Sequence, residues 1–218
     1  SVTISGNPQL EGLAGLDGLV AIGGSLAVWY NSSIASLDDL AELRFIDGAV
    51  SVRGNAALES LPDLPHIDSL GGLSVADNPS LEAISGFTAL ESIGRYASAD
   101  EDGGAELIGG DLQLESNGRI ASLGGFGALT SVAGSIVVDG SAYAGSGGDP
   151  DAPLASPAAF GALRTVGGNL ALLDLGLADL SFLGSLEAVG GTLAVGTVTP
   201  SDPVQIETDL ALGRVGGG

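Results

Sequence analysis

A short unit recurs along this chain, mostly at intervals of 23 or 24 residues, and this repeat limits the fold more than any other feature. A Gly-Gly or Asp-Gly pair precedes a short alternating run, as in GGSLAVWYN from Gly23 and DGAVSVRGN from Asp47. A unit repeated this often predicts stacked coils, a solenoid, rather than one thick core. The predicted strand starts are Val2, Leu26, Val50, Leu73, Leu112, Ile136, Leu170 and Leu193.

Each strand run alternates apolar residues with a small or polar one, as Leu26 and Val28 do on either side of Ala27. This period of two is typical of a strand with one buried face. We interpret the Gly pairs as tight corners, because glycine adopts backbone angles that other residues avoid. The opposite, solvent-facing row is predicted to be Thr3, Ala27, Ser51, Ser74, Gln113, Val137, Ala171 and Ala194.

An Asn follows the strand in five units, at Asn7, Asn31, Asn55, Asn78 and Asn117. Asn side chains stacked at a corner can bond the backbone of adjacent coils, so the pattern predicts an Asn ladder. The pattern fails at Ser141, and its register is ambiguous near Asp174 and Leu175. We therefore expect the last coils to be less regular.

Apolar residues then recur at every third position, for example at Ile34, Leu37, Leu40, Leu43 and Ile46. A period of three fits neither a long helix nor a strand, and it indicates short extended or 3₁₀ pieces that turn one residue in three inward. Stacking buries these residues together, and each Leu or Ile contributes about 1.5–3 kcal/mol. The sequence thus predicts a mainly β, β-helix-like solenoid of about eight coils.

The run from Gly23 to Ile46, followed by Asp47 and Gly48, fits the pattern GGxLxVxxNxxLxSLxxLxxLxxIGG. This pattern resembles the receptor L-domain branch of the leucine-rich-repeat-like solenoids, and the resemblance covers nearly the whole chain. The resemblance implies a right-handed solenoid on an exported, extracellular or cell-surface protein that binds a partner. The chain departs from the family in having no cysteine. The matching positions are core, corner or ladder, so no ligand-contact residue is carried over.

The charge of the chain limits the classes of partner that it can bind. The formal charge is −21, and the six basic residues are all Arg. So acidic a chain repels phosphate backbones, and we expect no nucleic-acid partner. The charge fits either solubility, including in a salty environment, or the binding of cations or basic partners. No apolar run approaches the roughly 18 residues of a membrane span, so no span is expected in this chain.

Two segments, 94–108 and 141–153, exceed the repeat and are predicted to be inserted loops. Insertions in repeat proteins often carry binding sites. Their carboxylates could hold a structural calcium ion, and the alternative is that the loops are simply solvated and bind no metal. No other cofactor is expected. The candidate calcium ligands are Asp100, Glu101, Asp102, Asp149 and Asp151.

Trp29 and Tyr30 follow the second strand, and Arg53 stands at the position equivalent to Trp29 one coil later. Aromatic residues and Arg are frequent anchors of binding interfaces, so these three residues are a candidate binding patch. The alternative is that they pack against a neighbouring coil or a flanking domain. His66 follows Pro65 in a corner and is expected at the surface.

We do not expect an enzyme. The chain has one His and no Cys, and no Ser has a neighbouring His that could activate it. We expect a non-catalytic recognition or adhesion module of a secreted or cell-surface protein that binds a protein or a glycan. The alternative is a structural subunit of an extracellular filament or surface layer, formed by head-to-tail self-association. Residues 1–218 are expected to form a single solenoid domain within a longer array.

Overall fold

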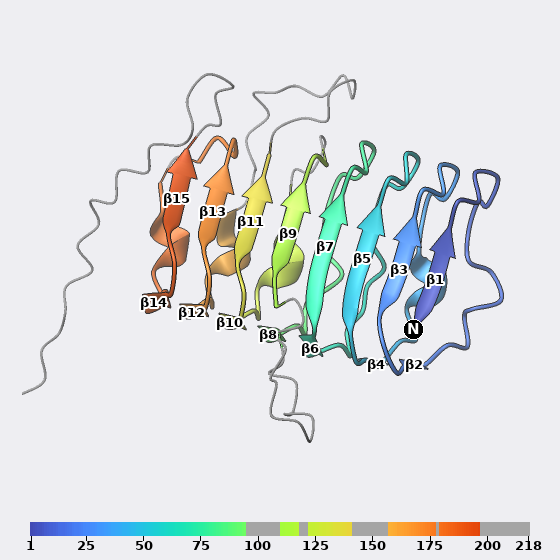
Figure 1. The fold of residues 1–218 in the computed structure, drawn as a ribbon, viewed down its shortest axis with the longest axis horizontal. Helices are drawn as coiled ribbons and strands as arrows, with labels where there is room; N and C mark the ends of the chain where they lie inside the picture. Colours follow the sequence, from blue (N-terminus) through green and yellow to red (C-terminus); the bar gives the residue numbers. More distant parts are fainter. Residues whose placement is uncertain (95–109, 118–121, 141–156, 178, 197–218) are drawn as a thin grey trace, which may run out of the picture.

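Residues 1–94, 110–117, 122–140, 157–177 and 179–196 are described by a computed structural model, and they form a mainly β structure (Figure 1). Eight strands lie side by side in one parallel sheet, in the order in which they occur along the chain. These strands are β1 (Val2–Ser5), β3 (Leu26–Trp29), β5 (Ala49–Arg53), β7 (Gly72–Ala76), β9 (Leu112–Glu115), β11 (Ile136–Asp139), β13 (Leu170–Leu173) and β15 (Leu193–Gly196).

The strands pair at the predicted register. Val2 pairs with Leu26, and Leu26 pairs in turn with Val50. The row continues through Leu73, Leu112, Ile136, Leu170 and Leu193. All eight predicted positions therefore lie in one row, and six of them are the first residue of their strand, whereas β5 and β7 begin one residue earlier, at Ala49 and Gly72. The register holds between Leu73 and Leu112 even though residues 95–109 intervene in the chain.

The return path behind the large sheet consists of short pieces, as the period of three predicts. A five-stranded sheet and a two-stranded one line this path. The five strands are β6 (Ser69–Leu70), β8 (Ser92–Ile93), β10 (Ser131–Val132), β12 (Thr165–Val166) and β14 (Ala188–Val189), and the two are β2 (Ala21–Ile22) and β4 (Phe45–Ile46). The helices are 3₁₀ turns: η1 (Asp38–Leu40), η2 (Gly124–Phe126), η3 (Pro157–Phe160) and η4 (Ser181–Leu183). No helix in the described ranges is long and apolar enough to cross a membrane.

A continuous apolar core runs between the large sheet and the return path. The every-third residues of the second repeat are almost completely buried, and so are their equivalents in the next two repeats. Phe87, Phe126 and Phe160 form a column through successive repeats, with ring centroids 5.9 and 6.0 Å apart and the rings nearly parallel. Each repeat therefore buries its apolar side against its neighbours, as expected for units that cannot fold alone.

The predicted Asn ladder is confirmed. In each step the Oδ1 atom of one Asn accepts the backbone N–H of the Asn in the preceding repeat, at 3.0–3.1 Å, along Asn7, Asn31, Asn55, Asn78 and Asn117. The side-chain amide donates as well: Asn55 Nδ2 bonds the carbonyl of Arg53 in its own strand and that of Val28 in the preceding repeat. One buried side chain thus satisfies backbone groups of two repeats.

The ladder position can also be recognised where Asn is absent. The residue before each ladder Asn has a positive φ, from 54° at Ser116 to 70° at Gly6. Asp174 has the same conformation, with φ of 52°, so the buried Leu175 occupies the ladder position in the repeat of β13. Ser141 lies outside the described residues. The return path is less well buried at both ends of the stack than in its middle: Leu177, Leu180 and Leu186 are only partly buried, and so are Leu10, Leu16 and Leu19 of the first repeat. The predicted irregularity of the last coils is seen in the ladder, where Leu175 replaces Asn.

The corner glycines are required for their small size, and the interpretation that they supply unusual backbone angles is wrong for these corners. Gly24, Gly48 and Gly71 do not have a positive φ. A Cβ atom on Gly48 would instead lie 2.9 Å from the Gly24 carbonyl carbon and 2.9 Å from the Ser25 nitrogen. The corners of successive repeats therefore stack backbone on backbone, and a side chain would hold them apart.

A second polar ladder at the start of the strands was not anticipated. The residue before the strand accepts a backbone N–H from the following repeat: Ser1 Oγ from Ser25 at 3.1 Å, and Ser135 Oγ from Asn169 at 3.1 Å. Asp111 and Asn169 act in the same way. Ala49 and Gly72 have no such acceptor, and there the strands start one residue earlier, so that Ala49 pairs directly with Gly72.

The stacking of the corners predicts that an added methyl group is harmful at Gly48, the second glycine position of a corner pair, and harmless at Gly23, the first position of its pair. Gly48→Ala should lower the free energy of unfolding by about 1–3 kcal/mol, because the methyl group meets fixed backbone. Gly23→Ala should change it by less than about 0.5 kcal/mol, because nothing lies within 4 Å of the added Cβ. Chemical denaturation measures both. Equal losses in the two variants would contradict the stacked corners.

Candidate functional site

The outer face of the large sheet carries a row of small side chains, aligned as predicted from Thr3 across to Ala194. The row is less exposed than expected: Ala27 is only 7% exposed. The neighbouring strands shield it, and the indole of Trp29 reaches across to Ser51, which is paired with Ala27. The prediction of a solvent-facing row is therefore correct in register but wrong for Ala27 and Ala194, which are buried.

Trp29 is fixed on this outer face by the next strand. It pairs with Arg53 in register, which confirms that the two residues are neighbours. The indole Nε1 donates to Ser51 Oγ at 2.9 Å. Trp29 nevertheless stays 37% exposed, so the indole ring is held by a hydrogen bond and is still accessible to solvent.

Tyr30 is also held against the next repeat. A Cβ atom on Gly54 would lie 2.5 Å from Tyr30 Cδ1, so the ring rests where only glycine leaves room. Tyr30 has a φ of 55°, a left-handed conformation that costs an L-residue about 1–2 kcal/mol. The equivalent residues in the flanking repeats are Gly6 and Gly54. Asp77, Ser116 and Asp174 hold the same conformation at this corner, so the backbone geometry belongs to the repeat, and what distinguishes Tyr30 is an aromatic ring that is 56% exposed.

Arg53 is oriented by Asp77 of the following repeat. Both Arg53 Nε and Nη2 lie 2.9 Å from Asp77 Oδ2. Because the Arg53 side chain is more than half exposed, the pair adds little to stability, but it fixes the guanidinium. Trp29, Tyr30 and Arg53, with Ser51 and Asp77, form what we call the aromatic patch.

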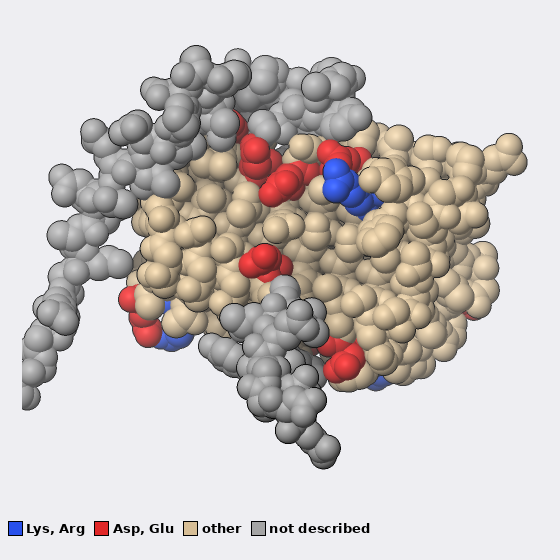
Figure 2. Space-filling model, in the orientation of Figure 1, with Lys and Arg blue, Asp and Glu red and all other residues tan. Residues whose placement is uncertain are grey.

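The surroundings of the aromatic patch are acidic. Figure 2 shows acidic side chains gathered near the strand ends, beside a basic group. Asp77, Glu115 and Asp139 lie at the ends of β7, β9 and β11. The other two Arg residues in the described ranges also stand beside carboxylates, Arg44 by Glu42 and Arg164 by Glu187. An anionic ligand would therefore meet a repulsive field at this face.

The predicted calcium ligands lie outside the described residues, namely Asp100, Glu101, Asp102, Asp149 and Asp151. Segments 95–108 and 141–153 of the expected insertions lie there too. Within the described part, no three carboxylate or His side chains gather as a metal site would require. Calcium binding therefore stays a prediction. His66 is exposed, as expected.

Among the described residues, two carboxyl groups have a lowered pKa, and both belong to turns. The Gly15 N–H lowers the pKa of Asp17, and the Ser181 hydroxyl and N–H lower that of Asp179. A lowered pKa keeps each group ionised, which suits a hydrogen-bond acceptor in a turn. Neither carboxyl group is poised near neutral pH as a general acid or base would be.

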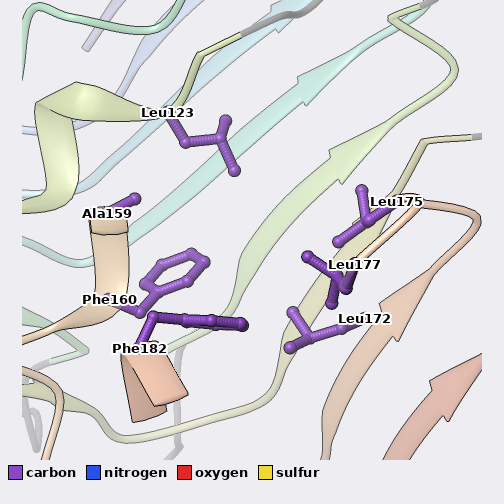
Figure 3. A pocket seen from close by; sticks show the side chains of 7 residues that line it. All are labelled: Leu123, Ala159, Phe160, Leu172, Leu175, Leu177 and Phe182. Atoms are coloured by element: carbon purple, nitrogen blue, oxygen red, sulfur yellow. The ribbon is translucent and has the colours of Figure 1, made fainter. Parts of the chain in front are cut away.

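An apolar crevice opens where the Asn ladder has ended (Figure 3). It is too narrow to admit a water molecule. Leu175, in the ladder position, faces Phe160 and Phe182 of the return path across it (Figure 3). All seven lining side chains are apolar, so the crevice offers no group for catalysis: Leu123, Ala159, Phe160, Leu172, Leu175, Leu177 and Phe182.

No family model, curated protein or solved structure matches this chain. The resemblance to receptor L domains therefore stays a prediction that rests on the sequence pattern. Head-to-tail self-association also stays a prediction, because residues 197–218 lie outside the described ranges.

The strain at Tyr30 can be tested by comparing two replacements. Tyr30→Gly and Tyr30→Ala both remove the ring from Gly54, but only glycine tolerates the left-handed conformation. We expect Tyr30→Gly to unfold with a free energy about 1 kcal/mol higher than Tyr30→Ala in urea denaturation. If the Ala variant is as stable as the Gly variant, the strain is absent.

Proposed function

We propose that this protein is a non-catalytic recognition module of a secreted or cell-surface protein, built as a right-handed solenoid of about eight coils similar to receptor L domains. The observation that carries the proposal is the aromatic patch. Its two aromatic rings and its guanidinium are exposed, yet each is held in place by the next repeat. Exposed side chains that are already ordered lose little conformational entropy on binding.

The residue types favour recognition as well. Trp, Tyr and Arg are the residues that most often dominate binding energy at interfaces. The ring of Tyr30 supports the same role. The equivalent left-handed corner position is filled by Gly, Asp or Ser in the other repeats, at Gly6, Gly54, Asp77, Ser116 and Asp174. The corner itself therefore does not require an exposed aromatic side chain.

The chemistry of the patch favours binding over catalysis. The Asp77 carboxylate is engaged by Arg53, and the Ser51 hydroxyl accepts an indole N–H rather than facing a base. A nucleophilic Ser needs a neighbouring general base. The groups that bond Ser51 and Asp77 within the patch are an indole N–H and a guanidinium, and neither of them can take up a proton.

The proposal predicts that a partner is lost when the aromatic patch is altered. Labelled protein is screened on arrays of proteins and glycans, and each hit is titrated against the unlabelled protein. Trp29 is the sole tryptophan of the chain, so its fluorescence reports contact at the patch directly. Trp29→Ala should weaken binding at least about tenfold, measured by calorimetry.

Phe45→Ala is the matched control, because Phe45 is an aromatic residue that is 43% exposed on the separate strand β4. It should bind like the wild type. Hits that bind Trp29→Ala as tightly as the wild type would contradict the assignment of the patch.

A further inference from the structure

We infer that the aromatic patch binds an uncharged polysaccharide, laid across β3, β5 and β7 with a sugar ring against Trp29. This inference rests on the recognition function proposed above and names the ligand class. A sugar ring has an apolar face of C–H groups and a rim of hydroxyl groups. It therefore suits an aromatic ring that is surrounded by hydrogen-bonding side chains.

The neighbours of Trp29 on the outer face are polar and small. Ser51, Ser74 and Gln113 follow one another in register on β5, β7 and β9. Ser51 accepts the indole N–H, so its own hydroxyl hydrogen remains able to donate to a ligand. Adjacent strands lie about 4.8 Å apart, and an extended chain crossing them would meet one such polar group per strand.

The patch is poorly suited to the apolar core of a protein interface. Specific protein interfaces bury about 800 Å² on each partner around an apolar centre. Trp29 and Tyr30 are the large exposed apolar residues at this place, and the others in the described ranges lie elsewhere. Val20 and Phe45 stand at or beside β2 and β4, and Val195 stands on β15 at the far end of the sheet.

Charge disfavours anionic ligands. The formal charge of −21 and the carboxylates of Asp77 and Glu115 repel an anionic polymer. Arg53 adds no net positive charge here, because its guanidinium is paired with Asp77. An uncharged polymer does not meet this repulsion.

The shape of the site favours a polymer over a free sugar. Small ligands are usually held in concave pockets that enclose most of their surface. The patch lies on an open strand face, where its side chains form a line rather than a cavity. A long chain can compensate for weak contacts at each unit by touching several strands at once.

Affinity electrophoresis of the intact protein tests the inference. Native gels contain soluble β-glucan, mannan, xylan or dextran, and polygalacturonate serves as the anionic comparison. We expect at least one uncharged polysaccharide to retard the wild type and Phe45→Ala equally. Trp29→Ala should lose at least about tenfold in apparent affinity, Trp29→Phe should recover part of it, and polygalacturonate should retard none of them. Thermal melts confirm that each variant is folded.

Three results would overturn the inference: no retardation by any of the four uncharged polysaccharides, equal retardation of Trp29→Ala, or preferential binding of polygalacturonate. The array screen separates this failure from failure of the proposed function. A purified protein ligand that depends on Trp29 would leave recognition intact and refute the polysaccharide. If no ligand of either class depends on the patch, both are wrong.

Discussion

The backbone at the corner after each strand leaves the sheet while still surrounded by protein, so its polar groups need partners that the strands cannot supply. Stacked Asn carboxamides supply them. Asn31, Asn55 and Asn78 are completely buried, and each links its own repeat to both neighbours. Because an unpaired buried group costs about 1–3 kcal/mol, this ladder ties each of the first five repeats to the register of its neighbour. The core and the glycine corners depend on that register.

The same register orders the side chains on the outer face. A side chain on one repeat finds its support on the next: Trp29 on Ser51, Tyr30 on Gly54 and Arg53 on Asp77. The side chains of the aromatic patch are therefore ordered by the stacking of the repeats, without being enclosed in a pocket. The strain at Tyr30 is tolerated because the ladder fixes the corner on both sides, at Asn31 and Asn55.

Features that follow the period of the sequence could be predicted. The strand register, the Asn ladder, the inward row and the pairing of Trp29 with Arg53 depend only on which residues share a position. The role of the corner glycines could not be predicted, because the sequence of one repeat does not show how closely the corners of two stacked repeats approach each other. The second ladder was missed because its acceptor changes between Ser, Asp and Asn. Leu175 could be placed only through the backbone conformation of Asp174.

Hydrogen exchange of the Asn side-chain amides, followed by NMR, tests the stacking most directly. We expect strong protection of the carboxamide protons of Asn31, Asn55 and Asn78, which are buried between repeats, and fast exchange for the exposed Asn7. Similar, fast exchange at all four would show that residues one repeat apart do not lie on one another, and would contradict the fold and the patch built on it.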